Sequence, residues 1–237
     1  MKNVLAEAHV PESAFGKWFL RSNTWTDYVL EVALEDLTHL LKDSPRTFNV
    51  IADVGCGYGR SMKKLNDRYS PERLIAMDID QEMLDETKKE VALHNLNNVE
   101  YVRCSSSMIK LEDNSVDMVF CHQTFHHLIY QPEALKEFLR ILKPGGIFMF
   151  AESTKRYIHS WIIRLLFRHP MSVQKTADEY LTLIKDSGFT VNDEQISYPF
   201  LWWSREDLAI GENLFGIKPP TDREETLINL IAVKPFA

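Results

Sequence analysis

Short apolar runs alternate with longer amphipathic segments along most of this chain of 237 residues. Runs of this length, rich in branched and aromatic side chains, are typical of buried strands. Five such runs are clear, and two further strands are predicted within 189–203 and 226–233. Strands that alternate with helices in this way predict an α/β fold with a mostly parallel sheet. The five clearest runs are residues 48–54, 74–78, 99–103, 116–120 and 147–151.

The segments between these runs carry helix signals. Residues 13–43 are predicted to form two helices, with an apolar stripe at helical spacing that stops at Ser44-Pro45. Residues 132–142 are predicted to form another helix, with proline at its start. Residues 152–176 combine basic side chains with apolar residues at helical spacing, which predicts a basic amphipathic helix.

The first apolar run ends in an acid, Asp53, and then breaks into three alternating glycines, Gly55, Gly57 and Gly59. Glycines so placed let the backbone turn sharply and come close to a ligand at the carboxyl end of a strand. A dinucleotide site has the different spacing G-x-G-x-x-G. The acid before the first glycine would also repel a pyrophosphate, whereas it suits a ligand that carries an ammonium group.

Composition narrows the classes of function. The formal net charge of −7 argues against a general nucleic-acid-binding protein, because phosphate binding needs a basic surface. The N-terminal residues lack the apolar core of a signal peptide, and no apolar run is long enough to span a bilayer. The three widely spaced cysteines suggest neither a disulfide framework nor a zinc site. We therefore expect a cytoplasmic protein of one domain.

Three motifs together resemble one family. Asp53-Val54-Gly55-Cys56-Gly57-Tyr58-Gly59 is similar to the first motif of the class I S-adenosylmethionine-dependent methyltransferases, of the methyltransferase-11-like type. Asp78 ends the second apolar run, and Leu142-Lys143-Pro144-Gly145-Gly146 precedes the fifth. The resemblance is close over residues 49–152 and looser toward the C-terminus. It implies a doubly wound, Rossmann-like sheet of seven strands, with helices on both faces and the last strand antiparallel.

The resemblance also implies how the chain is divided within a single methyltransferase domain, residues 1–237. Residues 1–46 would form a helical lid, and residues 47–152 the cofactor-binding core. Residues 153–176 would be a cap insertion, and residues 177–237 a C-terminal helix and strand pair.

The cofactor that the resemblance implies is S-adenosylmethionine. Asp78 would hold the ribose hydroxyls and Ile79 would contact the adenine, while the glycine loop would meet the methionine end. Where relatives carry an adenine-binding acid, this chain has Ser105, which can accept a hydrogen bond but carries no charge. The expected cofactor-binding residues are Asp53, Gly55, Cys56, Gly57, Gly59, Asp78, Ile79, Ser105, Ser106, His122 and Tyr28.

His122, His126 and Glu152 are the candidate catalytic residues, because a histidine or carboxylate beside the methyl group can take a proton from an oxygen or nitrogen nucleophile. The two histidines are four residues apart, which would place them on one helix face. This spacing is found in zinc-protease helices, but Gln123 stands where such a helix has its glutamate, so no metal is expected. The acceptor pocket is expected to include Trp25, His126, Trp161 and Trp202.

These features predict methyl transfer from S-adenosylmethionine to a small-molecule acceptor, and the aromatic segments that flank the core favour a lipophilic one. A methyltransferase acting on protein or RNA is an alternative, which the basic segment 155–175 supports. A non-catalytic S-adenosylmethionine-binding regulatory protein would fit the departure at Ser105, and a dehydrogenase is a third alternative. No nucleic-acid partner is expected, while the basic amphipathic segment suits contact with a membrane surface. The sequence leaves the acceptor atom and the oligomeric state open.

Overall fold

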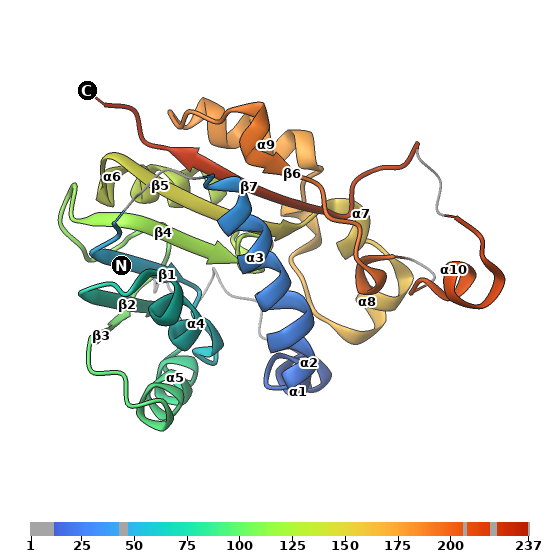
Figure 1. Cartoon of the computed structure of the whole chain (residues 1–237), viewed down its shortest axis with the longest axis horizontal. Coiled ribbons are helices and arrows are strands. Elements are labelled where there is room, and N and C mark those ends of the chain that lie inside the picture. Colours follow the sequence, from blue (N-terminus) through green and yellow to red (C-terminus); the bar gives the residue numbers. More distant parts are fainter. Residues whose placement is uncertain (1–11, 43–46, 206–207, 219–221, 237) are drawn as a thin grey trace.

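The computed structural model describes residues 12–42, 47–205, 208–218 and 222–236. Its centre is a seven-stranded sheet in the order β3-β2-β1-β4-β5-β7-β6 (Figure 1). Strands β1 to β5 pair in parallel, whereas β7 runs antiparallel to β5 and pairs antiparallel with β6. The predicted fold class, with its antiparallel last strand, is confirmed. The strands are β1 (Val50–Val54), β2 (Arg73–Asp78), β3 (Val99–Arg103), β4 (Val116–His122), β5 (Leu142–Ser153), β6 (Ile196–Ser197) and β7 (Leu227–Val233).

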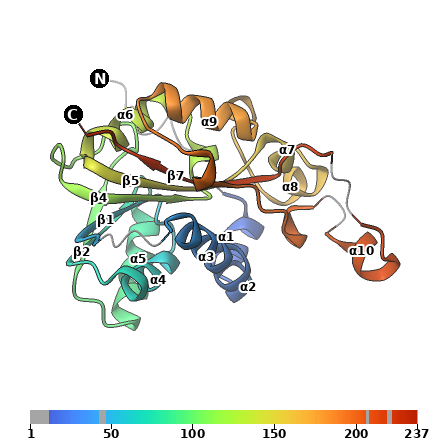
Figure 2. The same ribbon diagram turned by 45° about the horizontal axis from the view of Figure 1, so that its top comes forward.

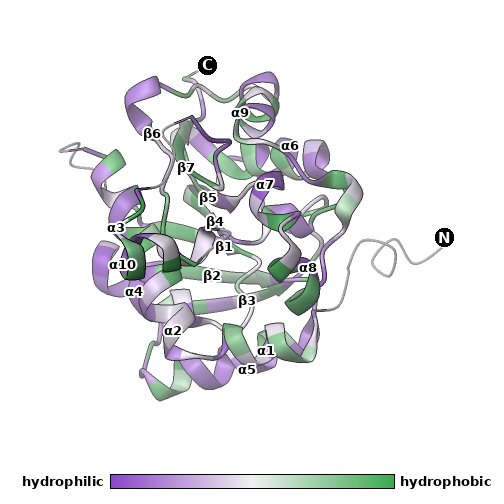
Figure 3. Cartoon of the chain, turned by 90° about the vertical axis from the view of Figure 1, so that its right-hand side faces the viewer, coloured by the Kyte–Doolittle hydropathy of each residue, from purple (hydrophilic) through white to green (hydrophobic). Residues whose placement is uncertain are grey.

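Helices cover both faces of the sheet (Figure 2). Successive residues of a strand point to opposite faces, so Ile51 packs toward one helical layer and Ala52 toward the other. The first layer holds α3 (Glu31–Leu40), α4 (Arg60–Tyr69) and α5 (Gln81–Leu93), and the second holds α6 (Gln131–Ile141) and α9 (Ala177–Asp186). The hydrophobic residues of the strands lie between these layers, while polar residues occupy the outer helical faces (Figure 3).

The order of the strands reverses between β1 and β4, because the chain first adds β2 and β3 on one side and then β4 and β5 on the other. At such a reversal the loops that follow the two central strands turn away from each other and leave a crevice at the carboxyl edge of the sheet. The glycine loop follows β1, and the segment with the predicted histidines follows β4. The topology therefore brings these two motifs together.

The N-terminal segment forms two helical stretches, as predicted. The first is α1 (Ala14–Leu20); the second runs through α2 (Asn23–Trp25), a π-helical turn (Thr26–Leu30) and α3. The sequence did not reveal the π turn. The predicted stop at Ser44-Pro45 lies outside the described residues.

The expected single amphipathic helix in the cap insertion is wrong. Two short helices are present, α7 (Lys155–Ile158) and α8 (Trp161–Leu166). Ser160 between them adopts an extended backbone, which breaks the helical period. Ile158 and Ile163 are buried, whereas the Trp161 side chain is 68% exposed.

The C-terminal third continues the sheet only briefly, because β6 has two residues. A 3₁₀ turn, Trp202–Ser204, and α10 (Ile210–Phe215) lie between β6 and β7, and α10 projects beyond the edge of the sheet (Figure 1). Among the described residues, no helix has the length and apolar character needed to cross a membrane. The division of the chain into lid, core, cap and C-terminal pair stays a prediction.

Candidate functional site

The glycine loop wraps over the end of β2. The main-chain N–H groups of Gly55 and Cys56 both donate to the carbonyl oxygen of Met77, at 2.8 and 3.0 Å. Gly55 has a φ of 76°, and a Cβ atom there would lie 2.1 Å from Cγ2 of Thr124, which belongs to the turn after β4. Only glycine fits this contact, so the loop packs directly against the Thr124 side chain of the β4 turn.

Asp53 lies beneath the loop. Its side chain is buried and accepts a hydrogen bond from the hydroxyl of Ser61 in the first turn of α4. Burial raises the pKa of Asp53 from 3.8 to about 7. Neither Asp53 nor Gly59 lines the cavity described below: Asp53 fixes the loop to α4, and Gly59 allows α4 to pack closely on Thr87 of α5. Their part in binding a cofactor stays a prediction.

Asp78, at the end of β2, is held in one orientation by two main-chain donors. Its Oδ2 accepts from Gly57 N–H at 3.0 Å, and its Oδ1 accepts from Asp80 N–H at 2.9 Å. A carboxylate has about four lone-pair sites, which is enough to accept hydroxyl donors as well as main-chain N–H groups. The carboxylate is therefore fixed in place by the loop that it borders.

A cavity of about 200 Å³ opens at this edge of the sheet. The predicted residues that line it are Gly55, Cys56, Gly57, Asp78, Ile79, Ser105, Ser106, His122 and Trp25. The sequence reasoning missed a second set, which comes from α1 and the residues just before it, and from the segment between β4 and α6. This set includes Glu12, Lys17, Leu20, Thr124, His127 and Tyr130.

Three other predicted aromatic positions lie away from the cavity. Tyr28, Trp161 and Trp202 do not line it, and their side chains are 56%, 68% and 46% exposed. Tyr28 lies inside the π-helical turn Thr26–Leu30, whereas Trp25 ends α2 just before it. A π turn has more residues per turn than an α-helix, so the two side chains point in different directions. Trp161 opens the separate helix α8, and Trp202 lies in the 3₁₀ turn after β6. The roles expected of these three residues in binding cofactor or acceptor stay predictions, and the cavity does not support them.

Ser105 occupies the position where relatives carry an acid. Its hydroxyl lies 2.9 Å from the Ser107 hydroxyl and also accepts from Ser107 N–H at 3.3 Å. This serine turn lines the cavity with hydroxyl and main-chain groups. A ligand here meets neutral polar groups.

His122 is the last residue of β4, not part of a helix. Its ring lies between Trp25, at a centroid distance of 5.3 Å, and Phe120, at 6.0 Å. Burial lowers the pKa of His122 to about 3, so the ring is neutral at physiological pH. Its Nε2 is buried and has no hydrogen-bond partner among the described residues.

His126 and Glu152 contact each other. Nδ1 of His126 lies 2.5 Å from Oε1 of Glu152, and His126 N–H donates to Oε2 at 3.2 Å. Both side chains are almost fully buried, and neither lines the cavity. The expected pairing of His122 with His126 on one helix is wrong, because β4 extends through His122 and His126 lies in a separate 3₁₀ turn, Phe125–His127.

Lys17 and Arg60 attach the N-terminal helices to the core beside the cavity. Lys17 Nζ lies 3.3 Å from Glu82 of α5. Arg60, at the start of α4, donates to the carbonyl oxygen of Arg21 at 2.9 Å and to Glu90 at 3.0 Å. The cavity therefore has one wall from the N-terminal segment and one from the sheet.

The fold and the cavity define a Rossmann-like class of protein, with a ligand-sized cavity at the carboxyl edge of a doubly wound sheet. Residues 52–150 match the family model described as a methyltransferase domain. This match agrees with the predicted resemblance to the class I S-adenosylmethionine-dependent methyltransferases, and with the prediction that S-adenosylmethionine is the cofactor.

Three comparisons illustrate the similarity. A malonyl-[acyl-carrier protein] O-methyltransferase of Marinomonas sp. (strain MWYL1) is 26% identical, over 68% of this chain and 60% of its own length. A demethylmenaquinone methyltransferase of Listeria monocytogenes is 26% identical, over 65% of each chain. This chain thus spans less than two thirds of each curated relative. The crystal structure of a methyltransferase from Aquifex aeolicus superposes with a TM-score of 0.66, at 19% identity, over 92% of this chain and 96% of that one.

The residues present fit this cofactor. Gly57 has a φ of 53°, and a Cβ atom there would meet nothing closer than 4.0 Å, so its main chain is open to a ligand. Asp78 lies beside it with its carboxylate oriented, and Ile79 offers an apolar surface next to the serine turn. The cavity thus offers the open main chain at Gly57 to the amino acid end of the cofactor and the Asp78 carboxylate to its ribose. Ile79 and the serine turn face the place of its flat base.

Proposed function

We propose that this chain transfers a methyl group from S-adenosylmethionine to a small, lipophilic acceptor. The observation that carries the proposal is the wall of the cavity beyond the glycine loop. Leu20, Trp25, Leu128 and Ile129 supply apolar side chains there, next to the neutral ring of His122. Such a wall favours an apolar molecule and excludes water from it.

The cofactor supplies an electrophilic methyl group, so the protein has mainly to position two reactants in line. Asp78 and the glycine loop hold the cofactor side. Trp25 and the apolar residues of the turn after β4 hold the acceptor side. Because these walls belong to different elements that contact each other at Gly55 and Thr124, the relative position of the two sides is fixed.

His122 has a narrower role in this proposal than that of a strong base. With a pKa of about 3 it removes a proton poorly at neutral pH. Its unpartnered Nε2 can instead accept a hydrogen bond from an acceptor O–H or N–H and so orient it. Glu152 is hydrogen-bonded to His126, and because neither side chain lines the cavity, this proposal gives neither of them the role of base.

Of the two curated relatives described above, the one whose name gives demethylmenaquinone supports an acceptor of this class. A protein or RNA acceptor has less support, because the basic residues of the cap lie in a segment that contributes none of the residues lining the cavity. Action in the cytoplasm stays a prediction.

The test is conversion of S-adenosylmethionine to S-adenosylhomocysteine across a panel of acceptors. The panel contains quinols, fatty acids and acyl thioesters, with unstructured peptides and RNA as the competing classes. Turnover with a member of the first group, abolished by Asp78→Ala, supports the proposal. Turnover with peptide or RNA alone contradicts the acceptor class, and tight S-adenosylhomocysteine binding without turnover on any acceptor contradicts catalysis.

A further inference from the structure

We propose that His126, His127 and His169 bind one divalent transition-metal ion of the zinc type. His127 also lines the cavity described above, but none of the three is among the residues expected to hold the cofactor, and the proposal does not depend on methyl transfer. His126 and His127 come from the 3₁₀ turn after β4, and His169 comes from the cap, beyond α8.

The three rings form a compact group. One ring nitrogen of each residue lies within 4.8 Å of one ring nitrogen of the other two. The ring centroids are 4.2 Å apart for His126 and His127, and 4.9 Å from each of these to His169. Nitrogen ligands at about 2 Å from one tetrahedral ion are roughly 3.3 Å from each other. Small side-chain rotations therefore bring the three nitrogens to bonding distance.

His126 is the residue whose surroundings point to a metal. Its side chain is 3% exposed, and its Nε2 is buried without a hydrogen-bond partner among the described residues. Leaving such an atom unpaired costs stability, so it calls for a partner. The two neighbouring imidazole rings lie beside it, and a metal ion shared with them would satisfy it.

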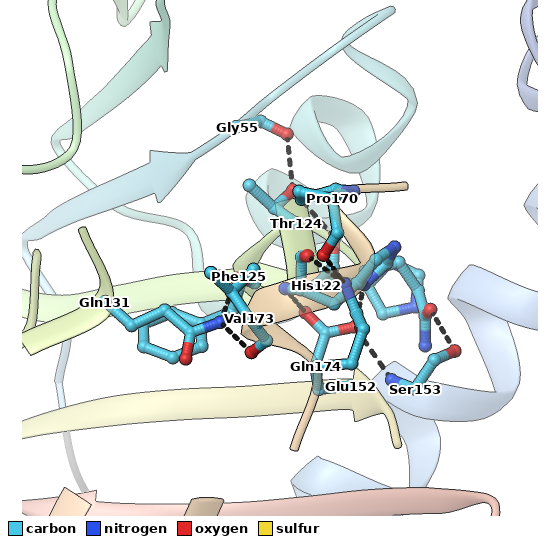
Figure 4. A network of polar contacts seen from close by, with 12 residues as sticks. Gly55, His122, Thr124, Phe125, Gln131, Glu152, Ser153, Pro170, Val173 and Gln174 are labelled. Carbon is cyan, nitrogen blue, oxygen red and sulfur yellow. Dashed lines mark hydrogen bonds and ion pairs between the residues drawn. The ribbon is translucent and has the colours of Figure 1, made fainter. Parts of the chain in front are cut away.

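Glu152 orients this ring. Its Oε1 lies 2.5 Å from Nδ1 of His126 and also accepts from Ser153 N–H at 2.7 Å (Figure 4). A carboxylate only accepts, so Nδ1 carries the proton and Nε2 presents its lone pair. A carboxylate behind a histidine that binds zinc is the usual outer-shell arrangement, because it fixes the tautomer and makes the ligand more basic. Glu152 is therefore a positioning residue.

Two amide side chains fasten the segment that carries His169. Gln174 Nε2 donates to the carbonyl oxygens of His126, at 2.8 Å, and of Pro170, at 2.9 Å. Gln131 Nε2 donates to those of Phe125 and Val173, both at 3.2 Å (Figure 4). Each amide thus joins the turn after β4 to residues 170–174 of the cap, which directly follow His169 and so preorganise a site built from distant parts of the sequence.

The donor set selects the class of ion. Three imidazole nitrogens suit zinc and its neighbours among the transition metals, whereas magnesium and calcium prefer oxygen ligands. Three protein ligands also leave a tetrahedral ion one open position. Because His127 lines the cofactor cavity, an ion held here would lie at the cavity wall.

The test uses the full chain without a polyhistidine tag, stripped with a chelator and titrated with Zn²⁺ by calorimetry. Co²⁺ serves as a second probe, because its visible absorption reports tetrahedral coordination. We expect one ion per chain. Replacing the positioning residue, Glu152→Gln, should weaken binding about 10–100-fold, and removing a ligand, His169→Ala, should weaken it further.

His159→Ala is the matched control, because His159 is an exposed histidine of the same cap and lies outside the cluster. It should bind Zn²⁺ like the wild type. Binding of S-adenosylhomocysteine by His169→Ala shows that this variant is folded. The proposal is overturned if the wild type binds Zn²⁺ no more tightly than His169→Ala does, or if His159→Ala loses affinity to the same extent.

Discussion

Glu152 accepts hydrogen bonds from both the ring and the main chain of His126, at 2.5 and 3.2 Å. The carboxylate is fully buried and does not reach the cofactor cavity. Glu152 is expected from the sequence to act as a base. Its contacts instead indicate a structural role, because its two oxygens accept from three donors, which are the ring and main-chain N–H groups of His126 and the main-chain N–H of Ser153.

Replacing this carboxylate should destabilise the fold. Glu152→Ala leaves the ring and main-chain donors of His126 and the N–H of Ser153 buried without their acceptor. We expect the free energy of unfolding to fall by about 3 kcal/mol, measured by urea denaturation. Glu133→Ala, which removes an exposed acid of α6, should change it by less than about 0.5 kcal/mol. Equal stability of Glu152→Ala and the wild type would show that the three donors find other partners.

The two loop glycines should differ in their tolerance of alanine. Both have positive φ, which costs an alanine about 1–2 kcal/mol. At Gly55 the new methyl group would also collide with Thr124, whereas at Gly57 it would enter open space. Gly55→Ala should therefore be less stable than Gly57→Ala by about 1–3 kcal/mol in thermal or urea unfolding. Gly57→Ala should mainly weaken cofactor binding, and similar stabilities would contradict the close contact.

Asp53 should make stability depend on pH. Its pKa is about 7 in the folded chain against 3.8 as the ordinary value, so the folded state holds an extra proton between these limits. The contribution of Asp53 to the free energy of unfolding is therefore largest below about pH 4. It falls by roughly 2–4 kcal/mol in all as the pH rises toward 7. Asp53→Asn should remove that decline, since an amide does not ionise. Melting temperatures between pH 4 and 8 test this, with the exposed Asp27→Asn as control; parallel curves for Asp53→Asn and the wild type would contradict it.

Asp78→Asn should lower the affinity for the cofactor. The amide oxygen can replace only one of the two acceptor oxygens that bond Gly57 N–H and Asp80 N–H, and the charge is lost. We expect calorimetry with S-adenosylhomocysteine to show binding weakened by at least about tenfold, since a hydrogen bond to a charged group is worth about 1.5–3 kcal/mol. Asp85→Asn, on the exposed side of α5, should bind like the wild type. Unchanged affinity in Asp78→Asn would remove Asp78 from the cofactor site.

Trp25 and Trp161 provide a matched pair for the acceptor side. Trp25 lines the cavity and packs edge-on against His122, whereas Trp161 is exposed on α8. With the best acceptor of the panel, Trp25→Ala should raise KM several-fold, because it removes an apolar wall, while Trp161→Ala leaves KM unchanged. A larger effect at Trp161 would place the acceptor against the cap.

The sequence predicted the core well because burial imposes simple patterns there. The apolar runs became strands, and the spacing of Gly55 and Asp78 predicted the cofactor side of the cavity. Other features depend on three-dimensional contacts that a linear pattern does not contain. Trp25 and Tyr28 look equivalent in a helical stripe, but the π turn between them separates their directions. The position of His169 beside His126 follows from the fold of the cap, which the sequence predicted as one helix.

The cap insertion begins and ends at one point of the fold. Lys155 N–H donates to the carbonyl oxygen of Lys175 at 2.6 Å, so the two ends of this segment are joined to each other by a hydrogen bond. A loop closed in this way fixes the distance between the end of β5 and the start of α9 at its own base. We therefore expect substitutions at exposed positions inside the segment, away from the buried Ile158 and Ile163, to leave the sheet and α9 in place.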